Sequence, residues 1–111
     1  MKHRTLRSLG AAAVVSFIIW PCVSPAQTAG TAQIAAGERV YSDYCSNCHG
    51  EGLRNTSGGV TFDLRRLRSE DHDSFVGAVL DGKRQMPPWR GALDMEQIES
   101  IWAYIRATVD R

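Results

Sequence analysis

The polar and apolar positions that follow residue 33 repeat at three- and four-residue steps. This spacing places six residues on one face of a helix: Ile34, Gly37, Tyr41, Tyr44, Cys45 and Cys48. It predicts a helix that begins at Ile34 and ends near Cys48, after a short frayed segment over residues 27–33. Glycine and polar residues are then concentrated over residues 50–61, which indicates a loop.

A second apolar stripe predicts a helix over residues 71–81. Its apolar positions are Phe75, Val76, Val79 and Leu80. Asp71 is expected at the N-cap, and Gly82 is expected directly after the C-terminus of this helix. Residues 82–92 form a second loop, which two adjacent prolines hold open.

The third predicted helix has the clearest start. Asp94 and Gln97 have the spacing of a capping box, and Leu93 and Ile98 have the spacing of a hydrophobic staple. The buried face is expected to consist of Ile98, Ile101, Trp102 and Ile105. Because no segment alternates in the way of a strand, the predicted fold class is all-α, with about three main helices.

The N-terminal segment is typical of a cleaved secretory signal peptide. An apolar run over residues 9–20 follows three basic residues and precedes small residues at Ser24 and Ala26. The run is shorter than the ~20 residues that cross a bilayer, so a retained anchor is disfavoured and no membrane span is expected in the mature chain. We predict a signal peptide over residues 1–26, one domain over residues 27–111 and a periplasmic location.

Charge and length narrow the class of protein further. Three of the 13 basic residues lie in the predicted signal, whereas all 12 acidic residues follow it, so the mature chain is slightly acidic. The lack of a strong basic patch argues against a nucleic-acid partner. A single domain of this size has a marginal core unless something is covalently attached to it, and we expect a monomer.

The most specific chemical signal is the run Cys45-Ser46-Asn47-Cys48-His49. Two cysteines separated by two residues and followed by histidine are the attachment signature of a c-type haem. Each thiol forms a thioether with one haem vinyl group, and the adjacent imidazole then reaches the iron. We therefore predict one covalent haem c on Cys45 and Cys48, with His49 as the proximal iron ligand.

Other readings of the cysteines are weaker. A zinc site would need two more ligands at suitable spacing, and no second cysteine pair is present. A thioredoxin-like redox pair would not need His49 and would expect a βαβ setting. A lipoprotein would use Cys22, but this residue follows Trp20 and Pro21 rather than small residues, so we expect it to leave with the signal.

These features together resemble the class I cytochromes c, which are single-haem electron-transfer proteins. Besides the haem motif, the resemblance rests on Gly37 and Tyr41 ahead of it, on Met86-Pro87 in a late loop, and on the end of the final helix over residues 101–105. It covers nearly all of the predicted mature chain. It implies a small cytochrome c fold, with helices and loops around one haem.

The resemblance also implies that the first and last helices cross at close range. Gly37 and Tyr41 would then meet Ile101 and Tyr104. The residues themselves agree with this, because a glycine inside an exposed helix costs about 1 kcal/mol relative to alanine unless packing compensates for it.

Three residues are candidates for the second axial position of the iron. Pro87 disfavours the α conformation in the residue before it, so Met86 is held extended on a stiff loop and is the predicted distal ligand. Met95 is expected to pack in the core or on the surface, and His72 is expected to be an exposed, solvated histidine. Ligation by histidine and methionine raises the reduction potential and leaves no open site, which favours a carrier and not an enzyme.

The predicted function is therefore periplasmic one-electron transfer. Residues 60–65, 82–83 and 86–89 are similar to small cytochromes that accept electrons from quinoprotein dehydrogenases, which depend on pyrroloquinoline quinone. The acceptor is expected to be a downstream cytochrome or an oxidase of the respiratory chain. Two alternatives remain: a haem-based sensor or peroxidase-like enzyme, which needs a vacant sixth position, and an electron-transfer subunit of a larger dehydrogenase complex.

The sequence does not choose a role for four further residues. Trp89 either lines the haem pocket, with its indole on a haem propionate, or packs in the core. Arg65, Arg66 and Arg68 form a local basic run. This run either pairs with a propionate, docks an acidic partner, or forms a solvated face.

Overall fold

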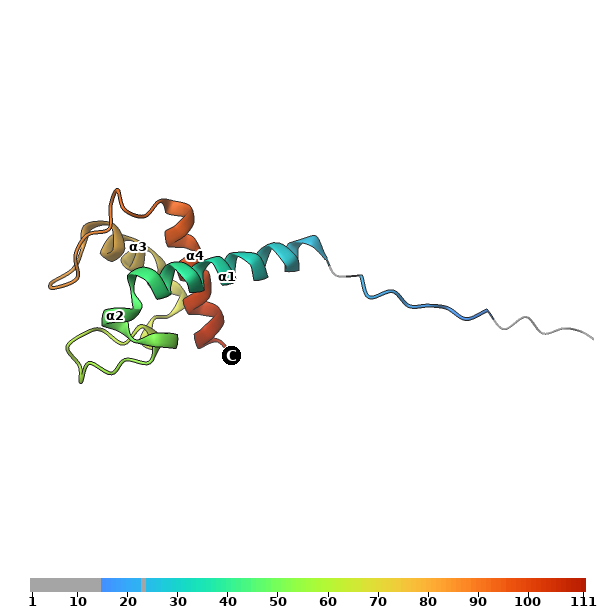
Figure 1. The fold of residues 1–111 in the computed structure, drawn as a ribbon, viewed down its shortest axis with the longest axis horizontal. Helices are drawn as coiled ribbons and strands as arrows, with labels where there is room; N and C mark the ends of the chain where they lie inside the picture. The colour runs from blue at the N-terminus through green and yellow to red at the C-terminus, as the bar shows by residue number, and fades with distance from the viewer. Residues whose placement is uncertain (1–14, 23) are drawn as a thin grey trace, which may run out of the picture.

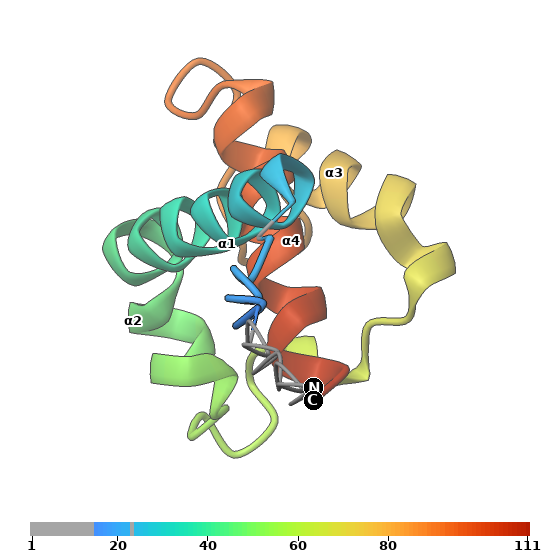
Figure 2. The same ribbon diagram turned by 90° about the vertical axis from the view of Figure 1, so that its right-hand side faces the viewer.

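Two long helices cross at the centre of the fold (Figures 1 and 2). The computed structural model describes residues 15–22 and 24–111. Helix α1 spans Pro25–Tyr44 and helix α4 spans Met95–Val109. The N-terminal turns of α1 project beyond the body of the fold, and its C-terminal half lies across α4 (Figure 1).

Gly37 makes the crossing of α1 and α4 possible. A Cβ atom on this residue would lie 1.8 Å from the carbonyl oxygen of Ser100, so only glycine allows the two backbones this close. One turn further along α1, the ring of Tyr41 packs at 5.3 Å from the ring of Tyr104. The predicted contact between the first and last helices is therefore confirmed.

Shorter elements complete the fold around this crossing. Helix α2 spans Ser46–His49 and helix α3 spans His72–Asp81. Three single turns of 3₁₀ helix link them: η1 over Glu51–Leu53, η2 over Leu64–Arg66 and η3 over Ser69–Asp71. The part of the chain that the structure describes contains no β-strand, and the prediction of an all-α fold is confirmed.

The hydrophobic core lies where α1, α3 and α4 meet. Its buried residues are Tyr41, Leu53, Phe75, Val79, Leu93, Ile98, Ile101, Tyr104 and Ile105. The buried residues of α3 and α4 recur at steps of three or four, as expected of amphipathic helices that bury one face, whereas α1 contributes Tyr41. Cys45 and Met86 are half-buried and pack against the edge of this core.

The predicted ends of two helices are also confirmed. At the start of α4, the backbone N–H of Gln97 donates to the Asp94 carboxylate at 2.8 Å, and the N–H of Asp94 donates to the Gln97 side chain at 3.0 Å. This pair of bonds is the capping box. At the end of α3, Gly82 has φ +77°, which a glycine adopts without strain.

Two local predictions were wrong. Helix α1 begins at Pro25 rather than at Ile34, because proline at the first helical position and the many alanines that follow favour helix from there. Asp71 precedes α3 but its carboxylate does not cap that helix. It accepts instead from the backbone N–H of Arg68 at 2.8 Å and thereby caps η3.

Most of the predicted signal peptide lies outside the described residues, because residues 1–14 and 23 are not described. The predicted cleavage point, between Ala26 and Gln27, falls in the first turn of α1. None of the helices formed by the described residues is long and apolar enough to cross a membrane.

Candidate haem site

The two cysteines and the histidine of the motif lie on consecutive helical turns. The backbone N–H of Cys45 donates to Tyr41 at 2.8 Å, and the N–H of His49 donates to Cys45 at 2.9 Å, so the helical path continues from α1 into α2. In such a path residues three and four positions apart share a face. Cys45, Cys48 and His49 therefore project on the same side, as attachment to one flat cofactor requires.

The two thiols differ in their surroundings. Cys45 is half-buried against the core, whereas Cys48 is exposed, and neither is in a disulfide. Burial, with a smaller contribution from the nearby Cys48, raises the pKa of the Cys45 thiol to about 11. The chain without haem therefore carries Cys45 as a neutral thiol at neutral pH.

The turn after His49 is held by a buried tyrosine. The hydroxyl of Tyr41, a residue only 1% exposed, donates to the carbonyl oxygen of Gly50 at 2.6 Å. Burial raises the pKa of this hydroxyl well above its usual value, so Tyr41 remains a donor. Gly50 itself has φ +84°, and a Cβ there would meet the Arg54 carbonyl oxygen at 1.9 Å.

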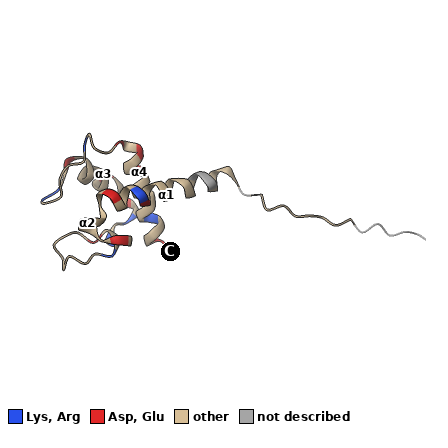
Figure 3. Ribbon diagram, viewed as in Figure 1, with Lys and Arg blue, Asp and Glu red and all other residues tan. Residues whose placement is uncertain are grey.

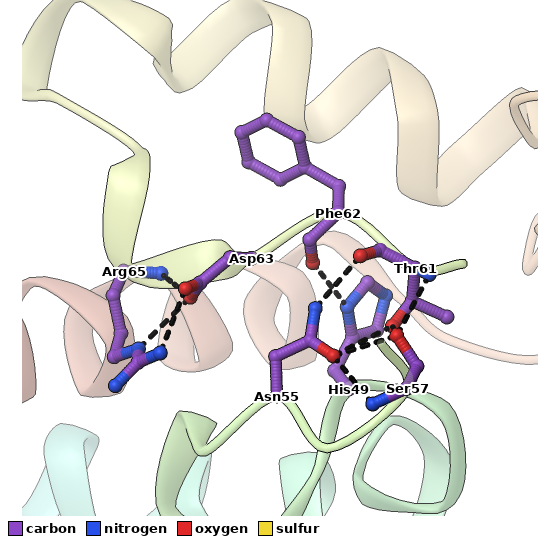
Figure 4. A network of polar contacts seen from close by, with 7 residues as sticks. All are labelled: His49, Asn55, Ser57, Thr61, Phe62, Asp63 and Arg65. Atoms are coloured by element: carbon purple, nitrogen blue, oxygen red, sulfur yellow. Dashed lines mark hydrogen bonds and ion pairs between the residues drawn. The ribbon is translucent and has the colours of Figure 1, made fainter. Parts of the chain in front are cut away.

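The ring of His49 is oriented by a backbone carbonyl (Figure 4). Its Nδ1 atom lies 3.1 Å from the carbonyl oxygen of Phe62. A carbonyl only accepts, so this bond places the proton on Nδ1 and leaves the Nε2 lone pair for a metal. Iron-binding histidines need this arrangement, and the residues present fit a haem iron at Nε2.

A polar network keeps the Phe62 carbonyl in place (Figure 4). The side chain of Asn55 donates to the Thr61 carbonyl at 2.7 Å and accepts from the Ser57 hydroxyl at 2.6 Å. The Thr61 hydroxyl donates to the Cys48 carbonyl at 2.9 Å. The loop is thus tied to the same helical turn that carries the haem motif.

Met86 ends a tight turn directly after α3. The backbone N–H of Lys83 donates to Met86 at 3.1 Å, and the N–H of Met86 donates to Lys83 at 3.0 Å. Three residues after Met86, the N–H of Trp89 donates to the Val79 carbonyl of α3 at 2.8 Å. Backbone hydrogen bonds therefore restrain the loop on both sides of Met86.

The other two axial candidates lie elsewhere. Met95 is 47% exposed in the first turn of α4. His72 was expected to be solvated, but it is half-buried, its Nε2 lies 3.0 Å from the Glu99 carboxylate, and its ring packs against Trp102 at 5.3 Å. The hydrogen bond to Glu99, and a weaker one to Asp73, raise the pKa of His72.

The arginines of the basic run and Trp89 each make a different contact. Arg65 forms an ion pair with Asp63 at 2.7 Å and lowers the pKa of that carboxyl. Arg68 lies 3.3 Å from Glu70. Arg66 instead lies over the ring of Phe62, at 5.9 Å from its centroid. The Trp89 ring packs edge-on against Tyr44 at 5.5 Å.

Sequence reasoning missed two parts of this site. The acceptor for His49 is a backbone carbonyl, and because every residue has one, the sequence does not identify it. Tyr41 was predicted only as part of the helix crossing, and the bond of its hydroxyl to Gly50 was not predicted. The Asn55–Ser57 turn had a readable signal, since asparagine and serine often bond the backbone of a turn in this way.

Comparisons with known proteins agree on one family. The family model for cytochrome c oxidase, cbb3-type, subunit III matches residues 32–105. The chain is 41% identical over 83 residues to quinohemoprotein alcohol dehydrogenase ADH-IIG of Pseudomonas putida, covering 73% of this chain and 11% of that protein. It is 32% identical over 77 residues to cytochrome c6 of Leptolyngbya boryana, covering 67% of this chain and 91% of that protein.

A solved structure also resembles this chain. The structure of quinohemoprotein alcohol dehydrogenase ADHIIG from Pseudomonas putida matches with a TM-score of 0.63 and 32% sequence identity. The match covers 96% of this chain and 15% of that one. The chain thus spans only about a tenth of the length of the two dehydrogenases it matches by sequence.

Proposed function

We propose that this chain, which belongs to the class I monohaem cytochrome c family, works as an exported one-electron carrier. Members of the family carry covalently bound haem c, and the bound haem supplies the one-electron ferric/ferrous couple. In this proposal Cys45 and Cys48 hold the haem through thioethers. His49 and Met86 occupy the two axial positions of the iron.

The observation that carries the proposal is the bond of His49 to Phe62. His49 directly follows the second cysteine of the motif, and the distance of 3.1 Å between its Nδ1 and the Phe62 carbonyl oxygen is that of a hydrogen bond. It fixes the plane and the tautomer of the imidazole and makes Nε2 a better donor to a metal. A histidine on the surface for other reasons would not need this restraint.

Met86 is proposed as the second axial ligand because its loop holds it in place. The turn bonds to Lys83 and the bond from Trp89 to α3 restrict the movement of the residue between them. A thioether that stays bound leaves no open position for oxygen or peroxide. The proposal therefore describes a carrier of electrons and not an enzyme.

Export is proposed from the N-terminal segment. Residues 1–26 have the basic, apolar and small-residue regions of a signal peptide, and cleavage would leave residues 27–111 in the periplasm. The mass of the protein purified from a periplasmic fraction tests this. We expect a mature chain that starts at Gln27 and carries one haem.

The proposed electron donor is a quinoprotein alcohol dehydrogenase. Two relatives, ADH-IIG and ADH IIB of Pseudomonas putida, are quinohemoprotein alcohol dehydrogenases, and each matches this chain over a small part of its own length. We propose that this separate chain receives electrons from such a dehydrogenase and passes them to a downstream cytochrome or oxidase of the respiratory chain.

The same relatives favour a second candidate, an electron-transfer subunit that stays bound to a dehydrogenase. Size-exclusion chromatography of the native protein separates the two. A free shuttle elutes as a monomer, whereas a subunit elutes together with its dehydrogenase.

Covalent attachment is tested by solvent extraction. When the holoprotein is denatured and extracted with acidic organic solvent, the colour should remain with the polypeptide, because thioethers resist extraction. Replacing both Cys45 and Cys48 by alanine should abolish stable holoprotein. Cys22→Ala is the matched control and should have no effect. Colour that passes into the solvent would rule out this mode of attachment.

Carrier function is tested by stopped-flow mixing. We expect fast reduction of the ferric protein by a quinoprotein alcohol dehydrogenase supplied with alcohol, and negligible turnover when the reduced protein meets hydrogen peroxide. Rapid, saturable peroxide turnover by the intact six-coordinate protein would favour an enzyme instead.

A further inference from the structure

An aromatic contact joins the two segments that hold the proposed ligands of the haem. Tyr44 is the last residue of α1 and directly precedes Cys45, whereas Trp89 lies three residues after Met86. Their rings meet edge-on, with 5.5 Å between the centroids and 78° between the planes. This geometry is favourable, because the positive edge of one ring faces the negative face of the other. The pair therefore draws the two segments together.

Tyr44 stands on a rigid part of the fold. Gly37 lets α1 lie against α4, and Tyr41 is only 1% exposed at that crossing. The backbone N–H of Cys45 donates to Tyr41 at 2.8 Å, so Tyr44 lies within the last regular turn of α1. The side chain of Tyr44 is itself 41% exposed. It contributes little to the core, so its contact with Trp89 needs another explanation.

Trp89 is tied to the end of α3. Its backbone N–H donates to the Val79 carbonyl at 2.8 Å, and the N–H of Arg90 donates to the Leu80 carbonyl at 3.2 Å. The side chain of Arg90 also forms an ion pair with Asp81. These bonds come from consecutive residues of the loop to consecutive residues of α3. Trp89 therefore belongs to the same rigid unit as the last turn of α3.

The turn between α3 and Trp89 has no slack. A Cβ atom on Gly82 would lie 2.7 Å from the Met86 carbonyl oxygen and 3.0 Å from the Pro88 nitrogen, so the turn folds back directly onto the end of α3. Two prolines, whose φ is fixed, then connect Met86 to Trp89. The turn, Trp89 and the end of α3 therefore move as one body, and Met86 leaves the iron when this body tilts away from α1 and α2.

Polar contacts do not link this body to the haem motif. Within the part of the chain that the structure describes, the hydrogen bonds and the ion pair of residues 82–93 stay inside this loop or reach α3. The tip of the loop carries Lys83 and Arg84, both exposed, and Figure 3 shows its basic residues projecting from the body of the fold. The rings of Tyr44 and Trp89 therefore supply the link between the two segments.

We propose that Tyr44 and Trp89 form a clasp that keeps Met86 on the iron, which makes them positioning residues for the distal ligand. This inference rests on the proposed function, because it needs Met86 to be the axial ligand. The clasp opposes ligand exchange, in which the bond between the Met86 sulfur and iron breaks and a bond to an incoming ligand forms. This exchange leaves the oxidation state of the iron unchanged.

The test is titration of the ferric holoprotein with imidazole, followed by the absorption band of the sulfur–iron bond. Imidazole takes the position that Met86 leaves, so its apparent affinity reports how firmly Met86 is held. Tyr44→Leu and Trp89→Leu should each raise this affinity roughly two- to tenfold, the size of one aromatic pair. The double variant should show no more than the larger single effect, because the second substitution removes a contact that is already lost.

Two controls separate the clasp from a general loosening of the fold. Tyr44→Phe keeps the ring and should bind imidazole as the unmodified protein does. Trp102→Leu removes a ring that packs at 5.2 Å from the ring of Phe75, between α4 and α3. This variant should unfold at a lower urea concentration without a comparable rise in its affinity for imidazole.

The outcomes separate this inference from the proposed function. If the unmodified protein binds imidazole as tightly as Met86→Ala, then Met86 is not the ligand, and the proposed ligation fails together with the clasp. If the unmodified protein and both leucine variants exclude imidazole equally, or if the two single effects multiply in the double variant, the clasp is wrong and the proposed function stands. The same holds if Tyr44→Phe or Trp102→Leu raises the affinity as much as Tyr44→Leu.

Discussion

Replacing Gly37 by alanine tests whether the crossing of α1 and α4 holds the fold together. The new Cβ would lie 1.8 Å from the Ser100 carbonyl oxygen and 3.0 Å from the Ile101 nitrogen. Both atoms belong to the backbone of a well-capped helix, so neither moves aside as a side chain would. The two helices must therefore part, by up to roughly 1.6 Å if an ordinary contact of 3.4 Å is to be reached.

The size of the effect follows from what lies at the crossing. Tyr41 and Ile101 are each 1% exposed and Tyr104 is 6% exposed, so a gap between the helices loosens side chains that are almost fully packed. Gaps of ~1 Å forfeit up to about half of each contact energy, and overpacking costs about 1–3 kcal/mol or more. The higher helix propensity of alanine relative to glycine offsets up to ~1 kcal/mol of this cost. We expect a net loss of about 2–4 kcal/mol in the free energy of unfolding.

Urea unfolding of the holoprotein, followed by circular dichroism, measures this loss. Gly77→Ala is the matched control, because a Cβ at this position in α3 meets nothing within 4 Å. It should leave stability unchanged or raise it by up to ~1 kcal/mol. If Gly37→Ala unfolds within ~0.5 kcal/mol of the unmodified protein, the close crossing does not contribute to stability as argued.

Two further predictions concern the ligand loop and a pH-sensitive contact. Met86→Ala should lower the reduction potential and let cyanide or carbon monoxide bind the iron, whereas Met95→Leu, at a 47% exposed position, should do neither; spectra and midpoint potentials decide, and the reverse pattern would mean that Met95 is the ligand. The hydrogen bond to Glu99 raises the pKa of His72, so this contact stabilises the fold fully below pH ~6.5 and is lost as pH rises through the folded-state pKa. Relative to Glu99→Gln, the unmodified protein should be more stable to thermal unfolding at about pH 5 than at about pH 8. An equal pH dependence of stability in both proteins would contradict this.

Helix ends were predictable because their signals are local. The capping box at Asp94 and the glycine at Gly82 each act within a few residues, and both lie where the sequence indicates. Asp71 shows the limit of this reasoning. Its carboxylate could cap either η3 or α3. It caps η3, which the sequence alone did not indicate.

His72 shows a second limit. Two flanking acids and a position at a helix start made a solvated histidine the natural expectation. The residue that binds it most closely, Glu99, lies 27 positions further along the chain. Only the packing of α3 against α4 brings the two together, and no local pattern contains that information.

The haem motif depends on residue type and short spacing, so the amino-acid sequence by itself determined it. A helical turn puts Cys45, Cys48 and His49 on one face whatever surrounds it. The carbonyl that orients His49 and the close approach of Gly37 to Ser100 were decided only by the tertiary structure. The physical reason is that backbone carbonyls are the same in every residue, and that contacts between elements far apart in the sequence form only when the helices pack.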